Sequence, residues 1–216
     1  MAIKLIIFDL DGTLINSIED ITNALNYAFG LCGVNDLTST EVTAMVGEGP
    51  SKLIHDVLAK RNLLSDAEAL VTRFLDYYTS HPTDKTLLYT VTREMLEALK
   101  DLKMAIVTNK TEELSHEILK KFGLDKYFDM VVAVDTIAER KPSPGPVIHV
   151  LSALNVAPED AVIVGDSMID IETGKASLVR TVAVTHGYGR TGFQEDADFV
   201  IGSLPELIDI VKNENR

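Results

Sequence analysis

Two acidic side chains follow the first apolar segment of the chain with a single residue between them. In the segment 6–17, IIFDLDGTLINS, the apolar run ends at Asp9 and Asp11, and Gly12 comes next. In a regular strand, positions i and i+2 point to the same face. Two like charges ~4 Å apart cost on the order of 4 kcal/mol at an effective dielectric constant near 20. The pair therefore indicates either a solvated turn or a site for a cation.

Later apolar segments also end in polar residues that suit a metal or a phosphate group. These are Thr108, Asn109 and Lys110 after Met104–Val107, Asp135 and Lys141 after Val131–Val134, and Gly165, Asp166, Ser167 and Asp170 after Ala161–Val164. The candidate metal ligands are hard carboxylate oxygens, with no His or Cys partner at metal spacing, which favours Mg²⁺ over zinc. Lysine, threonine, asparagine and loop amides suit the remaining phosphate oxygens.

A pair of carboxyl groups can divide the work of transferring a phosphoryl group. One carboxylate attacks phosphorus and forms an aspartyl phosphate. The other protonates the leaving oxygen and then takes a proton from the attacking water. Asp9 and Asp11 suit these two roles, and Gly12 lets the backbone turn away after them.

The elements that must position these residues alternate between strands and helices. Short β-branched segments predict strands, and apolar residues at helical spacing predict helices. The predicted strands are Ile3–Phe8, Met104–Val107, Val131–Val134, Ala161–Val164, Thr181–Val184 and Phe199–Ile201. The predicted helices between and after them are Thr92–Leu102, Glu112–Phe122, Pro146–Leu154, Ile169–Ala176 and Pro205–Val211. This order predicts an α/β fold, a doubly wound parallel-sheet (Rossmann-like) core with ligands at the carboxyl ends of its strands.

One block of the chain has helical patterns only. After a helix that begins near Ser17, the predicted helices are Thr38–Val46, Lys52–Arg61 and Ser65–Tyr78. We expect residues 16–85 to form an inserted, small, all-helical cap domain. Residues 1–15 and 86–216 then form the α/β core domain, and the linkers lie at residues 14–17 and 81–89.

The composition excludes several classes of protein. The 216 residues are 46% hydrophobic, and the net charge of −13 argues against general affinity for nucleic acid or an anionic membrane. No apolar run approaches the ~20 residues that span a bilayer. The single cysteine, Cys32, allows no internal disulfide, and the N-terminal segment does not resemble a signal peptide. We expect a cytoplasmic protein; the sequence does not indicate whether it is a monomer or a dimer.

The polar motifs and their order resemble those of the haloacid dehalogenase superfamily of phosphohydrolases. The matching segments are DLDGT at 9–13, TN at 108–109, KP at 141–142 and GDSMID at 165–170. The helical insertion resembles the small helical cap of that superfamily. VGEG at 46–49 within the insertion is similar to the phosphoglycolate phosphatase-like branch. Asn16 stands where an aspartate is frequent in the family, and we expect little effect on the chemistry.

The resemblance implies a role for each matching position. Asp9 would be the nucleophile, Asp11 the general acid and base, and Lys141 the cation that stabilises the phosphoryl charge. The metal ligands would be Asp9, the backbone carbonyl of Asp11, Asp166 and, directly or through a water, Asp170. The phosphate- and substrate-binding residues would be Thr108, Asn109, Gly12, Thr13 and, in a cap loop that closes over the core, Gly47 and Glu48.

These roles predict a Mg²⁺-dependent phosphatase that acts on a small phosphorylated metabolite, with 2-phosphoglycolate as the first substrate. An inorganic pyrophosphatase, a sugar-phosphate phosphatase or a phosphomutase of the same superfamily remains an alternative, as does a non-catalytic metal- or phosphate-binding module. Lys110 is either a surface lysine or a further phosphate ligand. The segment 187–192, GYGRTG, matches a dinucleotide-binding pattern, but no helix is predicted after it, so we expect a flexible loop at the rim of the site.

Overall fold

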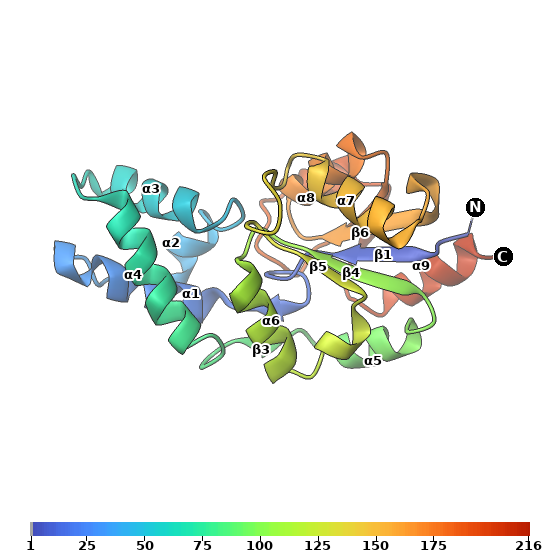
Figure 1. Cartoon of the computed structure of the whole chain (residues 1–216), viewed down its shortest axis with the longest axis horizontal. Helices are drawn as coiled ribbons and strands as arrows, with labels where there is room; N and C mark the ends of the chain where they lie inside the picture. Colours follow the sequence, from blue (N-terminus) through green and yellow to red (C-terminus); the bar gives the residue numbers. More distant parts are fainter. Residues whose placement is uncertain (1) are drawn as a thin grey trace.

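Residues 2–216, the part of the chain described by a computed structural model, contain a six-stranded sheet (Figure 1). Every neighbouring pair of its strands is parallel. The order across the sheet is β5 (Met130–Val132), β4 (Lys103–Val107), β1 (Leu5–Phe8), β6 (Ala161–Gly165), β7 (Arg180–Val184) and β8 (Phe199–Ile201). The predicted doubly wound α/β fold is confirmed, with small shifts at the ends of the strands.

Helices cover both faces of the sheet, which explains why its strands are apolar throughout. In β1, Ile6 and Phe8 join one buried cluster, whereas Leu5 and Ile7 join the cluster on the opposite face. The first face carries α5 (Thr92–Ala98), α6 (Glu112–Lys121) and α9 (Glu206–Glu214) (Figure 1). The second face carries α7 (Gly145–Leu154) and α8 (Met168–Ala176).

One core helix is shorter than its sequence pattern indicates. We predicted a helix that continues to Leu102, which was wrong, because α5 ends at Ala98. The backbone N–H of Leu102 donates to the carbonyl of Leu99 at 3.0 Å, and this turn brings the chain into β4. Leu99 is buried in the turn, so its hydrophobicity is satisfied without a helical conformation.

The remaining helices form a second lobe at one end of the molecule (Figure 1). They are α1 (Ile18–Phe29), α2 (Ser39–Thr43), α3 (Pro50–Arg61) and α4 (Ala67–Ser80). Their side chains form a separate hydrophobic cluster that includes Phe29, Phe74 and Tyr78 and that Leu114 of α6 also joins. Side-chain caps start two of these helices: Thr38 and Glu41 form a capping box at α2, and Asp66 accepts from two N–H groups of α4. This separate cluster supports the predicted cap domain at residues 16–85. The division of the chain into cap and core domains stays a prediction.

The two connections between the lobes lie side by side. β2 (Ile15–Asn16) pairs in antiparallel fashion with β3 (Leu87–Leu88), and we call this two-stranded element the hinge ribbon. Two-residue strands are too short to produce a periodic pattern, so the sequence did not reveal the pairing. The ribbon brings both linkers to one point beside the end of β1.

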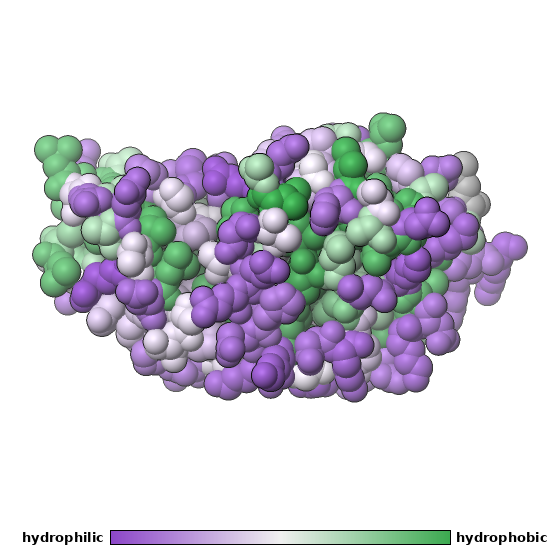
Figure 2. Space-filling model, viewed as in Figure 1, coloured by the Kyte–Doolittle hydropathy of each residue, from purple (hydrophilic) through white to green (hydrophobic). Residues whose placement is uncertain are grey.

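Hydrophilic side chains cover much of the face drawn in Figure 2, and they gather over α5 and α6. These helices turn their apolar sides to the sheet, where Leu96 and Ile118 are fully buried. Within residues 2–216, no helix combines the length and the apolar character that a membrane crossing requires.

A buried carboxylate holds the second linker in place. Asp20, in the first turn of α1, is 2% exposed. It accepts hydrogen bonds from the backbone N–H of Lys85 at 3.0 Å and from the N–H and hydroxyl of Thr86 at 2.8 and 2.7 Å. Removing the carboxylate would leave the buried N–H of Thr86 without this partner, which carries the desolvation cost of that group, and would remove two further hydrogen bonds.

We therefore expect Asp20→Ala to lower the free energy of unfolding by about 2–4 kcal/mol, measured by urea denaturation. Asp36→Ala is the matched control, because the Asp36 side chain is 72% exposed and its ion pair with Arg61 lies on the surface. This control is expected to change the free energy of unfolding by less than about 1 kcal/mol. Equal effects of the two substitutions would contradict the anchoring role of Asp20.

Candidate active site

The predicted site residues meet at the carboxyl end of β1, between β4 and β6. Asp9 directly follows β1, and its backbone N–H donates to the carbonyl of Val164 in β6 at 2.9 Å. Thr108 follows β4, and Asp166 follows β6. The chain continues from β4 to β5 on one side of β1 and from β6 to β7 on the other side. Because these connections diverge, a crevice opens at this edge of the sheet.

Three buried carboxylates lie together in this crevice. One oxygen each of Asp9, Asp166 and Asp170 lies within 4.8 Å of the others. Burial raises the pKa of Asp9 to about 7, partly offset by Lys141, and raises the pKa of Asp166 to about 8, where the other two carboxylates add to the effect. Ionisation of all three carboxylates at once is therefore unfavourable. Three hard oxygen donors at this spacing fit a divalent metal ion, whose charge would favour the ionised forms.

Lys141 provides a positive charge inside the cluster. Its Nζ donates to Asp9 Oδ1 at 2.7 Å and to Asp170 Oδ1 at 2.6 Å, and the residue is 3% exposed. Burial alone would lower the pKa of Lys141, but the two carboxylates outweigh burial and raise it. The other oxygen of Asp170 accepts from the hydroxyl of Ser167 at 2.7 Å in the capping box that starts α8. Asp170 thus connects Lys141 to the start of this helix.

Asp11 occupies a different environment from Asp9. Its carboxylate accepts a hydrogen bond from the Ser17 hydroxyl and lies 3.1 Å from the Nζ of Lys110. The backbone N–H of Gly12 donates to the carbonyl of Ile15 at 2.8 Å, so the strand geometry has ended and the chain turns. The side chain of Asp11 therefore lies outside the three-carboxylate cluster, and the resemblance predicts only its backbone carbonyl as a metal ligand.

Lys110 belongs to the site, although the sequence left it open. Its side chain is 5% exposed, and its Nζ donates to the hydroxyl of Tyr78, a cap residue, at 2.7 Å. The signal that pointed to it was its position directly after Thr108 and Asn109 at the end of β4. A lysine at a strand end is common on protein surfaces, so that signal alone did not distinguish the two interpretations.

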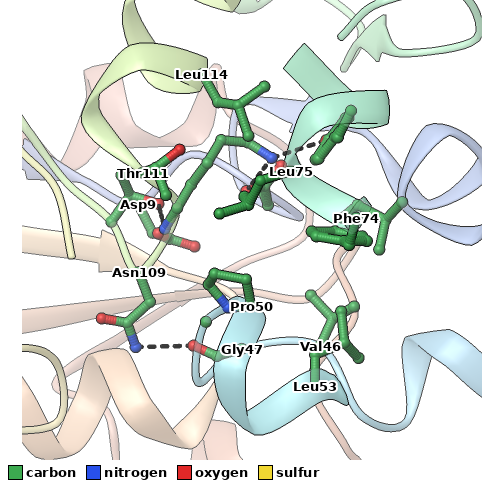
Figure 3. A pocket seen from close by; sticks show the side chains of 16 residues that line it. Asp9, Val46, Gly47, Pro50, Leu53, Phe74, Leu75, Asn109, Thr111 and Leu114 are labelled. Carbon is green, nitrogen blue, oxygen red and sulfur yellow. Dashed lines mark hydrogen bonds and ion pairs between the residues drawn. The ribbon is translucent and has the colours of Figure 1, made fainter. Parts of the chain in front are cut away.

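Asn109 connects the core to the cap loop. Its side-chain amide donates to the carbonyl of Gly47 at 2.8 Å, drawn in Figure 3, and to the carbonyl of Lys141 at 3.0 Å. The hydroxyl of its neighbour Thr108 accepts from the N–H of Lys110 at 3.2 Å. Gly47 thus contacts the site through its backbone, whereas Glu48 next to it is exposed.

Two donors hold the carboxylate of Asp166 in place. The hydroxyl of Thr13 donates to Oδ1 at 3.1 Å, and the backbone N–H of Tyr188 donates to Oδ2 at 2.6 Å. Gly12 allows this approach, because its φ is +87° and a Cβ there would collide with the Asp166 carboxylate. Thr13 and Gly12 therefore shape the carboxylate cluster.

The segment 187–192, GYGRTG, packs against the carboxylate cluster. A Cβ on Gly187 or Gly189 would collide with atoms of Asp166. The Tyr188 hydroxyl accepts from the N–H of Ser17 at 2.7 Å and lies 3.0 Å from Oδ1 of Asn16 in the hinge ribbon. A short 3-10 turn and then β8 follow the segment, not the helix that dinucleotide binding requires. The segment thus links the cluster to the hinge, a connection that the sequence did not reveal.

The cap and the core enclose a cavity of about 70 Å³ over Asp9 and Asp11 (Figure 3). The core contributes polar groups, and the cap contributes mainly apolar side chains, including Val46, Leu53, Phe74 and Leu75. A second cavity, of about 330 Å³, reaches the same two aspartates past Asp166, Tyr188 and Arg190. A ligand at Asp9 therefore has two cavities into which it can extend.

The tight approach of Gly12 to Asp166 can be tested with a single methyl group. We expect Gly12→Ala to lower the melting temperature, since the Asp166 carboxylate must move. For the same reason we expect it to weaken binding of a divalent cation at least tenfold, as measured by isothermal titration calorimetry with Mg²⁺ as the probe. Gly30→Ala is the matched control, because no atom lies within 4 Å of a Cβ there and the backbone is helical. Unchanged Mg²⁺ affinity in Gly12→Ala would contradict this account of the cluster.

Comparisons with known proteins agree with this geometry. A family model described as haloacid dehalogenase-like hydrolase matches residues 6–184. Phosphoglycolate phosphatases of Neisseria meningitidis and Aquifex aeolicus are each 38% identical to the chain. The alignment covers 95% of this chain and 92% of the first relative, and 97% of both chains for the second.

Solved structures show the same architecture. A predicted phosphoglycolate phosphatase from Haemophilus somnus superposes with a TM-score of 0.90 at 27% identity, covering 96% of this chain and 97% of the other. A mutant of CbbY from Rhodobacter sphaeroides in complex with xylulose-(1,5)bisphosphate gives a TM-score of 0.82 at 25% identity, with 95% and 96% covered. The sequence and the fold therefore agree that this chain belongs to the haloacid dehalogenase-like hydrolases.

Proposed function

We propose that this hydrolase is a Mg²⁺-dependent phosphatase of small phosphomonoesters, with 2-phosphoglycolate as the first candidate substrate. The observation that carries the proposal is the contrast between two neighbouring carboxyl groups. Asp9 lies among the buried acids beside Lys141, whereas Asp11 lies apart from them at the same cavity. The similarity to phosphoglycolate phosphatases over nearly the whole chain supports the choice of substrate.

The two aspartates would act in sequence. The carboxylate of Asp9 attacks phosphorus, the bond from phosphorus to the ester oxygen breaks, and that oxygen takes a proton from Asp11. Asp11 then takes a proton from a water molecule whose oxygen attacks the aspartyl phosphate. Inorganic phosphate leaves, and the carboxylate of Asp9 is restored. The Nζ of Lys141 lies 2.7 Å from Asp9 Oδ1 and would stabilise the negative charge on the phosphoryl oxygens during both steps.

The metal would bind between the carboxylates at the end of β1 and β6. Asp9, Asp166 and the backbone carbonyl of Asp11 would hold Mg²⁺, and Asp170 would bind it directly or orient one of its waters. When bound, Mg²⁺ supplies positive charge next to the phosphate oxygens. Thr13 and Tyr188 keep the Asp166 carboxylate in position for this role.

The remaining residues would bind and enclose the substrate. Thr108 and Asn109 line the cavity, and the Thr108 hydroxyl and the backbone N–H groups of this loop suit the phosphoryl oxygens. The hydrogen bond from the Asn109 amide to the carbonyl of Gly47 depends on the position of the cap loop. Closure of the cap at the hinge ribbon would exclude bulk water from the reacting groups.

A sugar-phosphate phosphatase is the second candidate. The larger cavity beside Arg190 has room for a substrate that extends past the smaller one. The likeness to the CbbY complex with a sugar bisphosphate favours the same possibility. A phosphate-release assay over 2-phosphoglycolate, sugar phosphates and pyrophosphate, compared by kcat/KM, ranks these candidates.

Replacing the proposed nucleophile tests the mechanism. We expect Asp9→Asn to reduce phosphate release by at least about 10³-fold, since an amide cannot form the aspartyl phosphate. Asp196→Asn is the control, because this acid is 55% exposed and pairs with Lys175 at the surface. Near-normal activity of Asp9→Asn with Mg²⁺ present would rule out the mechanism.

Metal removal should be visible in stability as well as in activity. We expect a chelator to abolish phosphate release and Mg²⁺ to restore it. Because Mg²⁺ binds the folded cluster, Mg²⁺ at 100 times its dissociation constant should raise the free energy of unfolding by about 2.7 kcal/mol. Asp166→Asn should lose most of this increment in urea denaturation. An equal increment in Asp166→Asn would place the metal elsewhere.

A further inference from the structure

The smaller cavity, between the cap and the core, contains a cation to which the proposed mechanism assigns no step. Among the described residues that line this cavity, Lys110 is the only one with a positively charged side chain. Its Nζ lies 2.7 Å from the Tyr78 hydroxyl and 3.1 Å from Asp11 Oδ2. An ammonium group has three donors, so these two partners leave one N–H for a ligand.

The surroundings of Lys110 favour an anionic ligand. Burial opposes its charge, but Asp11 and Tyr78 outweigh burial and raise its pKa, so the ammonium stays charged. Apolar side chains from both lobes surround the same space, among them Leu53, Phe74 and Leu114. A charged group in such surroundings gains most from a partner of opposite charge.

Tyr78 adds a second donor from the cap. It is 2% exposed, and burial raises the pKa of its hydroxyl to about 12, so the hydroxyl keeps its proton. While its oxygen accepts from Lys110, its O–H remains available to a ligand. Since Tyr78 lies on α4 and Lys110 follows β4, the two groups come together only when cap and core are in contact.

The size of the cavity limits what this pair can bind. This cavity is about 70 Å³, and Asp9 and Asp11, where the phosphoryl group would be attacked, line it together with Lys110 and Tyr78. A leaving group that enters this cavity is therefore short, and its far end lies near Lys110 and Tyr78. A carboxylate is the small anion that fits these conditions, whereas a second phosphate is larger.

We propose that Lys110 and Tyr78 form a subsite for a carboxylate on the leaving group, so that the enzyme prefers phosphate esters of short hydroxy acids. This inference rests on the proposed phosphatase function and names its substrate class. Lys110 is then a specificity-determining residue, because it contacts the substrate as well as Asp11. The cap residue Tyr78 makes recognition of the carboxylate depend on closure.

A comparison of two esters with the same two-carbon skeleton tests the subsite. 2-Phosphoglycolate carries the carboxylate and ethyl phosphate lacks it. We expect Lys110→Met to lower kcat/KM for 2-phosphoglycolate on the order of 10²-fold, and for ethyl phosphate by at most about tenfold. Lys100→Met is the matched control, because this lysine is 57% exposed and pairs with Glu97 outside the cavity. It should leave both values unchanged.

The alternative role for Lys110 is to orient Asp11. The effects of Lys110→Met on the two esters distinguish this role from the carboxylate subsite. If Lys110→Met lowers kcat/KM equally for both esters, the subsite is overturned, because an effect through Asp11 does not depend on the carboxylate. A wild-type enzyme that does not prefer 2-phosphoglycolate to ethyl phosphate also overturns it. In both cases hydrolysis of p-nitrophenyl phosphate by the wild type would show that the phosphatase function stands.

A second variant covers the possibility that Lys110→Met does not fold. Tyr78→Phe removes one oxygen and keeps the ring in the cap cluster. We expect it to lower the ratio of the two kcat/KM values on the order of tenfold to 10²-fold, the effect of one hydrogen bond to a charged group. An unchanged ratio overturns the subsite. If the wild type releases no phosphate from any ester, the proposed function itself fails.

Discussion

Three carboxylates share a small buried volume at the carboxyl end of the sheet, and much of the surrounding structure compensates for their repulsion. Lys141 pairs with two of them, Asp9 and Asp170. Thr13 and the Tyr188 N–H donate to Asp166. Such an arrangement fits a divalent cation, whose positive charge would also favour a phosphate group beside it. The loops after β1 and β7 approach Asp166 closely, and glycine stands at these contacts, at Gly12, Gly187 and Gly189, because a Cβ would collide there.

Communication between the cap and this cluster follows from the same contacts. The GYGRTG segment reaches Asp166 through Tyr188, whose hydroxyl contacts the hinge ribbon at Asn16 and Ser17. On the other side of the site, Asn109 donates to Gly47 of the cap loop. Under the proposed function, motion of the cap at the ribbon would disturb hydrogen bonds made by Asp166 and Asn109. Such motion would couple enclosure of a substrate to the geometry of the carboxylates.

The two aspartates of the first motif illustrate how local sequence and tertiary contacts share the control of chemistry. Their spacing brings both to one end of β1, but their environments come from different parts of the chain. Asp9 meets Lys141, which lies far away in sequence, whereas Asp11 meets Ser17 and Lys110. Two chemically identical groups thus have different environments, which suits the proposal that one carboxylate attacks and the other transfers protons.

The sequence by itself determined the fold class, the order of the elements and the edge of the sheet where polar residues gather. Apolar strands alternating with helices require a parallel sheet, and parallel strands deliver the residues that follow them to one edge, so Asp9, Thr108 and Asp166 were predictable. Only the tertiary structure decided which partners these residues meet. The hinge ribbon has strands too short for a period, and Tyr188 and Lys110 reach the site from loops whose paths depend on packing. Hydrogen bonds over long sequence separations, such as that from Lys110 to Tyr78, arise when the two lobes come together, and no local pattern encodes them.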